Sequence, residues 1–174
     1  MIRPAKAGAE TIVIGIDPGL AFLGYGLIAL AKGGLLRHVA HGCIRTSPSD
    51  PSELRLQQIF SGVRDILENY KPQYGGIEDL YFFRNVSSAL PVAEARGIIK
   101  LAFYQASVPL AEFTPNAIKK AVTGTARADK NQVQEMVRIL LGLSEPPKPD
   151  HAADALAAAV CRAHFEGPAG LGQI

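Results

Sequence analysis

The segment ETIVIGID, residues 10–17, constrains the fold most, because it is an apolar run rich in β-branched residues that ends in an acid. A Pro-Gly turn signal follows, so the run predicts a buried strand ending at Asp17. Two further strands are predicted at 24–30 and 35–46, joined through a Gly-Gly pair that is typical of a hairpin. Three strands with short links predict an antiparallel meander.

Apolar residues then recur at helical spacing between residues 52 and 70, which indicates one amphipathic helix. Strands are predicted next at 74–78 and 108–113, and between them, at 90–106, a helix that is apolar on more than one face. The rest is predicted to be helical over 115–122, 130–141 and 150–165. This order predicts an α/β domain with a mixed sheet flanked by helices.

Length and composition fit a single domain over residues 1–174, with 1–9 and 167–174 expected as flexible tails. Hydrophobic residues make up 48% and charged residues 20%, which excludes a disordered or fibrous chain. No signal-peptide pattern opens the chain and no apolar stretch is long enough to span a membrane, so we expect a cytoplasmic protein. Cys43 and Cys161 belong to no CxxC pair, and we expect both to be reduced.

The net charge of +2 does not by itself indicate a nucleic-acid partner, but the positive residues are unevenly placed. Residues 84–138 hold eight Lys or Arg against four Asp or Glu. The densest part is KKAVTGTARADK, residues 119–130, which could contact phosphates or could be only a solvated helix end and loop. Composition leaves both interpretations open.

Two acids, Asp17 and Glu78, stand at the ends of predicted strands, where an open α/β sheet binds its ligands. A charge is costly to bury unpaired, so each acid is either solvated or held by cations or donors. Asp150, His151 and Asp154 lie in the first turns of an alanine-rich helix that could pack close to the sheet. We expect Asp150 to be the N-cap, which leaves the other two on one face to meet the strand-end acids. Together these groups predict a site for Mg²⁺ or Mn²⁺.

The glycine-rich segment DPGLAFLGYG allows a competing interpretation, a cradle for nucleotide phosphates. It fails as a P-loop, because Tyr25 stands where the lysine belongs. The GxGxxA spacing at 24–29 falls in a strand and does not open a helix. An actin-like or sugar-kinase ATPase would need two domains to clamp its nucleotide, whereas a single domain is predicted for this chain.

The remaining polar residues near the strands are predicted to be structural. His38 and His41 lie three apart on the third strand, which should point them to opposite faces of the sheet. Asp79 should likewise point away from Glu78. His164 is expected at the C-terminal end of the last helix, where a basic group is favourable.

Six motifs in order carry a resemblance to a known family: IGIDPGLAFLGYG, GCIRT, GIEDLYFFRN, ALPVAEARG, ADKNQVQEMV and DHAADALAAA. From about Thr11 to Arg162 the chain resembles the RuvC Holliday junction resolvases, bacterial endonucleases with an RNase H-like fold. The resemblance implies a five-stranded mixed sheet, three strands antiparallel and then two parallel. It also implies a set of catalytic and metal-binding residues, one of which is a histidine where many members carry Asp. The set is Asp17, Glu78, His151 and Asp154.

The implied activity is the resolution of four-way DNA junctions, in homologous recombination and DNA repair, by symmetric nicking of two strands of like polarity. The implied chemistry is in-line hydrolysis of a phosphodiester bond assisted by two divalent ions, Mg²⁺ or Mn²⁺. Asp17 is assigned to both ions, Glu78 to one, and His151 with Asp154 to the other.

The resemblance also implies DNA contacts. Lys119 and Lys130 match basic positions near the cleaved strand, where a lysine can hold a phosphate. Tyr81 matches an aromatic implicated in junction contacts, so we favour it as a wedge that stacks on unpaired bases, with Arg84 on a phosphate. Packing as a buried anchor is the alternative for Tyr81, and the roles of the two phenylalanines that follow it stay open.

The implied partners are a second copy of the chain, as a homodimer whose interface could be the helix at 90–106, and the RuvA and RuvB branch-migration complex. Two rival functions are a nuclease acting on another structured nucleic acid or an RNA/DNA hybrid, and a non-catalytic DNA-binding module. The motifs after Glu78 argue against the first rival. The presence of all four site residues argues against the second.

Overall fold

The computed structural model describes residues 10–79 and 86–166, which form five strands and five helices in the predicted order. The strands are β1 (Thr11–Asp17), β2 (Phe22–Leu30), β3 (Leu36–Arg45), β4 (Tyr74–Glu78) and β5 (Leu110–Phe113). The helices are α1 (Ser52–Tyr70), α2 (Val86–Gln105), α3 (Pro115–Thr123), α4 (Lys130–Leu140) and α5 (Asp150–Glu166). Both predicted tails lie outside the described residues.

The strands form one mixed sheet in the order β3-β2-β1-β4-β5. β1 and β2 pair antiparallel, as do β2 and β3, whereas β4 runs parallel to β1 and to β5. The prediction of three antiparallel strands followed by two parallel ones is therefore confirmed. Because Ile16 pairs with Ile77 in the parallel ladder, Asp17 and Glu78 end neighbouring strands at the same edge of the sheet.

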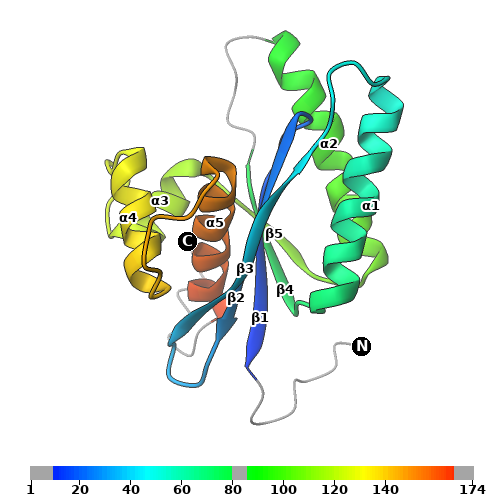
Figure 1. The fold of residues 1–174 in the computed structure, drawn as a ribbon. Coiled ribbons are helices and arrows are strands. Elements are labelled where there is room, and N and C mark those ends of the chain that lie inside the picture. Colours follow the sequence, from blue (N-terminus) through cyan, green and yellow to red (C-terminus); the bar gives the residue numbers. More distant parts are fainter. Residues whose placement is uncertain (1–9, 80–85, 167–174) are drawn as a thin grey trace.

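Helices cover both faces of the sheet (Figure 1). α1 and α2 lie on one face, where Ile14 and Ile16 are buried against them. α5 lies on the other face, where Val13 is buried, and α3 and α4 pack on the outer side of α5. Side chains alternate along a strand, so Asp17 shares a face with Val13 and points toward α5. No helix among the described residues is long and apolar enough to cross a bilayer.

α5 lies unusually close to β1 and β2, because both surfaces are made of small residues. A Cβ atom added to Gly15 would lie 1.9 Å from the main-chain oxygen of Ala155, and one added to Gly24 would lie 1.9 Å from that of His151. On the helix side, alanines from Ala152 onward are fully buried. The close approach of this helix to the sheet, predicted from the alanines, is confirmed. It also depends on the glycines of the strands, which leave room for the helix backbone.

The prediction that His38 and His41 point to opposite faces is wrong. Nε2 of His38 lies 2.7 Å from Nδ1 of His41, so the two rings meet on one face. The register shifts in β3, because Ala40 pairs with Leu27 while His38 pairs with Ile28, which leaves one extra residue between them. Such a β-bulge breaks the alternation of side chains on which the prediction rested. Cys43 and Cys161 are both free, Cys161 buried and Cys43 half-buried.

Candidate active site

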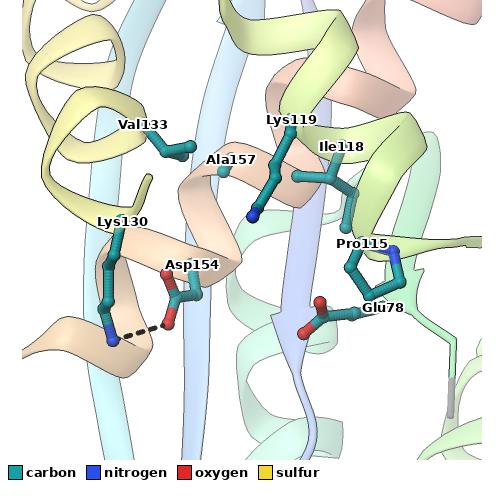
Figure 2. Close-up of a pocket in the computed structure, with 8 residues that line it drawn as sticks. All are labelled: Glu78, Pro115, Ile118, Lys119, Lys130, Val133, Asp154 and Ala157. Carbon is teal, nitrogen blue, oxygen red and sulfur yellow. Dashed lines mark ion pairs between the residues drawn. The ribbon is translucent and has the colours of Figure 1, made fainter. Parts of the chain in front are cut away.

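Three elements far apart in the sequence meet at the edge of the sheet where β1 and β4 end. Oδ2 of Asp17, the last residue of β1, lies 2.7 Å from Nδ1 of His151 in the first turn of α5. Glu78, the last residue of β4, and Asp154, one turn further along α5, line the same pocket (Figure 2). The structure therefore places the four acidic and histidine candidates at one site.

Burial and neighbouring negative charge raise the pKa values of Glu78 and Asp17. Burial, followed by the charges of Asp17 and Asp154, raises the pKa of Glu78 to about 7. Burial also raises the pKa of Asp17, and Asp154 adds to the effect, although the hydrogen bond with His151 opposes it. A cluster of acids held together at this cost is typical of a functional site.

Two lysines contribute positive charge to the pocket. Nζ of Lys130, at the start of α4, lies 3.3 Å from Oδ2 of Asp154 and 3.1 Å from Oδ2 of Asp150. Lys119, on α3, points toward the space between Glu78 and Asp154 (Figure 2). Both predicted basic residues therefore lie beside the carboxylates.

The prediction that Asp150 caps α5 is wrong. The main-chain carbonyl of Pro149 accepts the first bonds of the helix, from the amides of Ala152 and Ala153, so Pro149 takes the capping position. The Asp150 carboxylate faces α4, where it pairs with Lys130 and accepts from Nε2 of Gln134 at 3.3 Å. The helix thus begins one residue earlier than the capping argument assumed.

Phe22 belongs to the site although sequence reasoning missed it. Its ring stacks on the imidazole of His151, with 5.6 Å between centroids and an interplanar angle of 9°. The guanidinium carbon of Arg45, its partner across the β2–β3 ladder, lies 5.6 Å from the centroid of the Phe22 ring. The alternation of side chains along β2 could have identified it, because Phe22 lies two residues before Gly24 and so on the face that receives α5. The predicted strand, however, began at residue 24 and did not include Phe22.

The residue types at this site are suitable ligands for a divalent cation, although their side chains do not converge on one point in this structure. Within the part of the chain whose side chains are described, no three Asp, Glu, His or Cys groups are arranged to hold an ion. Asp154 instead pairs with Lys130, and Asp17 with His151. Three carboxylates and an imidazole are nevertheless the ligand types that Mg²⁺ and Mn²⁺ accept.

Tyr81 and Arg84 lie outside the described residues. Asp79 points to the opposite face of the sheet from Glu78, as predicted, where its Oδ1 accepts from Arg96 at 3.3 Å.

A family model described as crossover junction endodeoxyribonuclease RuvC matches residues 13–162, most of the chain. The chain belongs to the RuvC family. RuvC of Treponema pallidum (strain Nichols) is 50% identical over 163 residues, which cover 94% of this chain and 83% of that protein. RuvC of Treponema denticola is 49% identical over 158 residues, covering 91% of this chain and 88% of that protein.

The fold of this family is confirmed by a solved structure. Thermus thermophilus RuvC in complex with Holliday junction substrate is 36% identical to this chain, with a TM-score of 0.87. The match covers 92% of this chain and 97% of the Thermus chain. The RNase H-like mixed sheet implied by the sequence resemblance is therefore the observed one.

Proposed function

We propose that this protein is an endonuclease that resolves four-way DNA junctions by nicking two strands of like polarity. The observation that carries the proposal is the meeting of Asp17, Glu78, His151 and Asp154 at one edge of the sheet. It is supported by membership of the RuvC family and by the likeness to a relative solved with its junction substrate.

Asp17, Glu78, His151 and Asp154 would hold the metal, which we propose to be two Mg²⁺ or Mn²⁺ ions. Such ions activate water as a nucleophile and stabilise the leaving oxygen of a phosphodiester. His151 orients Asp17 through its Nδ1 atom, and Phe22 stacks on the ring and limits its rotation. These contacts hold two of the four groups in place before any ligand binds.

Lys130 and Lys119 are proposed to receive the scissile phosphate. Each ammonium group lies near carboxylates and offsets part of their negative charge. This reduces the repulsion between the site and the anionic backbone of DNA. Lys130 would exchange its contact with Asp154 for a phosphate oxygen when DNA binds. Outside the described residues, Tyr81 is proposed to stack on an unpaired base and Arg84 to contact a phosphate.

The proposed assembly is a homodimer that works in the cytoplasm with the RuvA and RuvB complex. Two symmetric nicks require two active sites, and the outer face of α2 offers exposed apolar side chains for an interface. Leu90, Leu101 and Tyr104 are 60%, 45% and 83% exposed. An apolar surface of this kind is a candidate for burial against a second copy.

A substrate comparison tests this function against its nearest rival. The purified protein is incubated with Mg²⁺ or Mn²⁺ and either a four-way DNA junction or an RNA/DNA hybrid of matched length. If the protein resolves junctions, it should cut the four-way junction faster than the hybrid, at symmetric positions in two strands. Faster cutting of the hybrid would instead favour a different nuclease of the same fold.

A further inference from the structure

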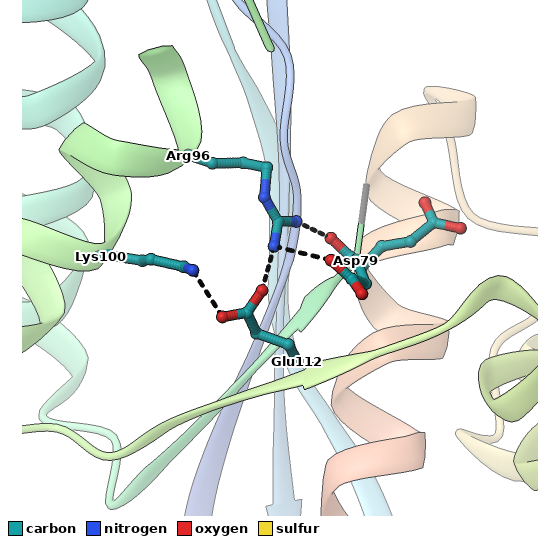
Figure 3. A network of polar contacts seen from close by, with 5 residues as sticks. Asp79, Arg96, Lys100 and Glu112 are labelled. Carbon is teal, nitrogen blue, oxygen red and sulfur yellow. Dashed lines mark hydrogen bonds and ion pairs between the residues drawn. The ribbon is translucent and has the colours of Figure 1, made fainter. Parts of the chain in front are cut away.

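A buried arginine on the face of the sheet opposite the carboxylate site contacts the end of β4 (Figure 3). Arg96 lies in α2 and is only 5% exposed. Its Nη1 atom donates to the main-chain carbonyl of Glu78. Nη2 donates to Asp79 at 3.3 Å and also to Oε2 of Glu112 on β5. One guanidinium thus joins α2, β4 and β5.

The surroundings of Arg96 balance its charge. Asp79 and Glu112 supply two negative charges, and Nζ of Lys100, one turn further along α2, lies 2.5 Å from Oε1 of Glu112. Two cations therefore face two carboxylates, which is the condition under which a buried arginine is tolerated. Because the two carboxylates hold the guanidinium on its other side, the donor that faces Glu78 has little freedom to turn away.

The Glu78 carbonyl belongs to the last peptide unit of β4, whose N–H, on Asp79, donates to the Phe113 carbonyl of β5 at 2.7 Å. Pairing of β4 with β1 ends at Ile77, and pairing with β5 ends at the Glu78–Phe113 pair. The orientation of this last peptide unit sets the direction of the Glu78 side chain, since successive side chains point to opposite faces. The β5 ladder holds the N–H of this peptide unit and Arg96 holds its carbonyl, so Arg96 restricts the rotation of the unit and with it the angle at which the Glu78 carboxylate enters the site.

We propose that Arg96 is a positioning residue for the nuclease site: by holding the Glu78 carbonyl from the far face of the sheet, it aims the Glu78 carboxylate at Asp17 and Asp154. Arg96 touches neither DNA nor metal in this role. The inference rests on the proposed nuclease function, in which Glu78 is a metal ligand. It makes α2 part of the support of the active site.

Three variants test the proposal: Arg96→Met, Arg96→Lys and the control Lys100→Met. The control breaks the Lys100–Glu112 pair of the same network but leaves the Glu78 carbonyl bonded to Arg96. For each variant we would measure the melting temperature, the affinity of the DNA-free protein for Mn²⁺ by electron paramagnetic resonance, and kcat and KM on a four-way junction.

The proposal requires Arg96→Met to bind Mn²⁺ more weakly and to lose about 10- to 100-fold in kcat, because a small misplacement of a catalytic group has effects of this size. KM for the junction should stay within about twofold, since DNA contacts are untouched. Arg96→Lys keeps the charge and one donor but not the planar fork, so it should recover part of both losses. Lys100→Met should match the wild type in kcat and Mn²⁺ affinity.

Wild-type kcat and Mn²⁺ affinity in folded Arg96→Met would overturn the proposal, as would an equal loss in Lys100→Met. If Arg96→Met does not fold, Arg96→Lys decides: a partial loss supports the proposal, whereas wild-type kcat and Mn²⁺ affinity would overturn it, because one ammonium group cannot reproduce the fork that ties the Glu78 carbonyl to Asp79 and Glu112. A wild-type protein that cuts no junction would contradict the proposed function. The Mn²⁺ measurement would still decide whether Arg96 positions Glu78.

Discussion

Nδ1 of His151 lies 2.7 Å from Oδ2 of Asp17, so the start of α5 holds the end of β1. The imidazole is also stacked on Phe22, which fixes the plane of the ring. With Nδ1 donating to Asp17, Nε2 is left as the nitrogen that can bind a cation. The contact therefore leaves the imidazole free to act as a ligand in the proposed metal site.

The first prediction concerns metal choice. Imidazole nitrogen suits Mn²⁺ better than Mg²⁺, which prefers oxygen ligands. His151→Asp should therefore lower the ratio of cleavage in Mn²⁺ to cleavage in Mg²⁺. The measurement is the initial rate of junction cleavage by both proteins in each metal, and equal ratios for the two proteins would refute this role of the histidine.

The second prediction concerns the close packing of α5. Gly24→Ala should displace the start of the helix, because the new Cβ would lie 1.9 Å from the main-chain oxygen of His151. Overpacking against a rigid backbone should lower the free energy of unfolding by about 3 kcal/mol or more. Chemical denaturation measures this loss.

Gly62→Ala is the matched control for Gly24→Ala. Its nearest neighbour is the terminal Cδ1 atom of Ile44, at 2.7 Å, which can rotate away. Alanine also favours the helix in which Gly62 lies, so little net change in stability is expected. Equal losses in the two variants would show that contact with the α5 backbone is not what makes Gly24 necessary.

The third prediction concerns pH. The pKa of Glu78 is about 7 in the folded protein against 4.5 ordinarily, so between these values the folded form retains a proton that the unfolded form releases. The free energy of unfolding of the metal-free protein should therefore fall as pH rises through this window. Glu78→Gln removes the effect and should be more stable than the wild type at about pH 8, by on the order of 2 kcal/mol.

Glu112→Gln is the control of opposite sign. Its hydrogen bond with Lys100 lowers the pKa of Glu112, so this group contributes stability above its ordinary pKa and loses it as pH falls. Glu112→Gln should therefore be less stable than the wild type at neutral pH. The free energy of unfolding of both variants and the wild type, measured at several pH values, tests the two predictions. A Glu78→Gln variant that is less stable than the wild type at high pH would contradict the proposed charge repulsion.

The fold could be predicted because its signals are local. The apolar run before Asp17 and the alternation of strands with helices determine the order of the elements, and parallel pairing then brings Asp17 beside Glu78. The β-bulge in β3 could not be predicted, because one extra residue leaves no mark on a strand of mixed composition. That is why the expected alternation of His38 and His41 fails.

The site was predictable to the extent that its groups stand out from their surroundings. His151 and Asp154 are conspicuous among alanines, as Asp17 is after an apolar run. Arg96 is not conspicuous, because a single arginine in a helix normally faces solvent and only the tertiary structure buries it. The capping prediction for Asp150 fails because the helix start depends on the Pro149 carbonyl rather than on a capping side chain.

The fourth prediction concerns Lys119. A lysine that contacts a phosphate releases a counterion, so removing it should weaken junction binding and reduce the slope of log K against log salt by about 1. Lys119→Gln should show both effects, whereas Lys32→Gln, in the hairpin at the other end of the sheet, should show neither. The slope is measured from junction binding without metal over a range of salt concentrations. An unchanged slope in Lys119→Gln would show that Lys119 does not contact a DNA phosphate.

The most direct test of the nuclease account is cleavage of a four-way DNA junction by the wild type and by Asp17→Asn, with and without a divalent metal. Asparagine keeps the size of the side chain and removes its charge, so junction binding should be retained. We expect symmetric nicks by the wild type only when Mg²⁺ or Mn²⁺ is present, and none by Asp17→Asn in either metal. Cleavage by Asp17→Asn at the wild-type rate, or metal-independent cleavage by the wild type, would contradict the proposed nuclease function.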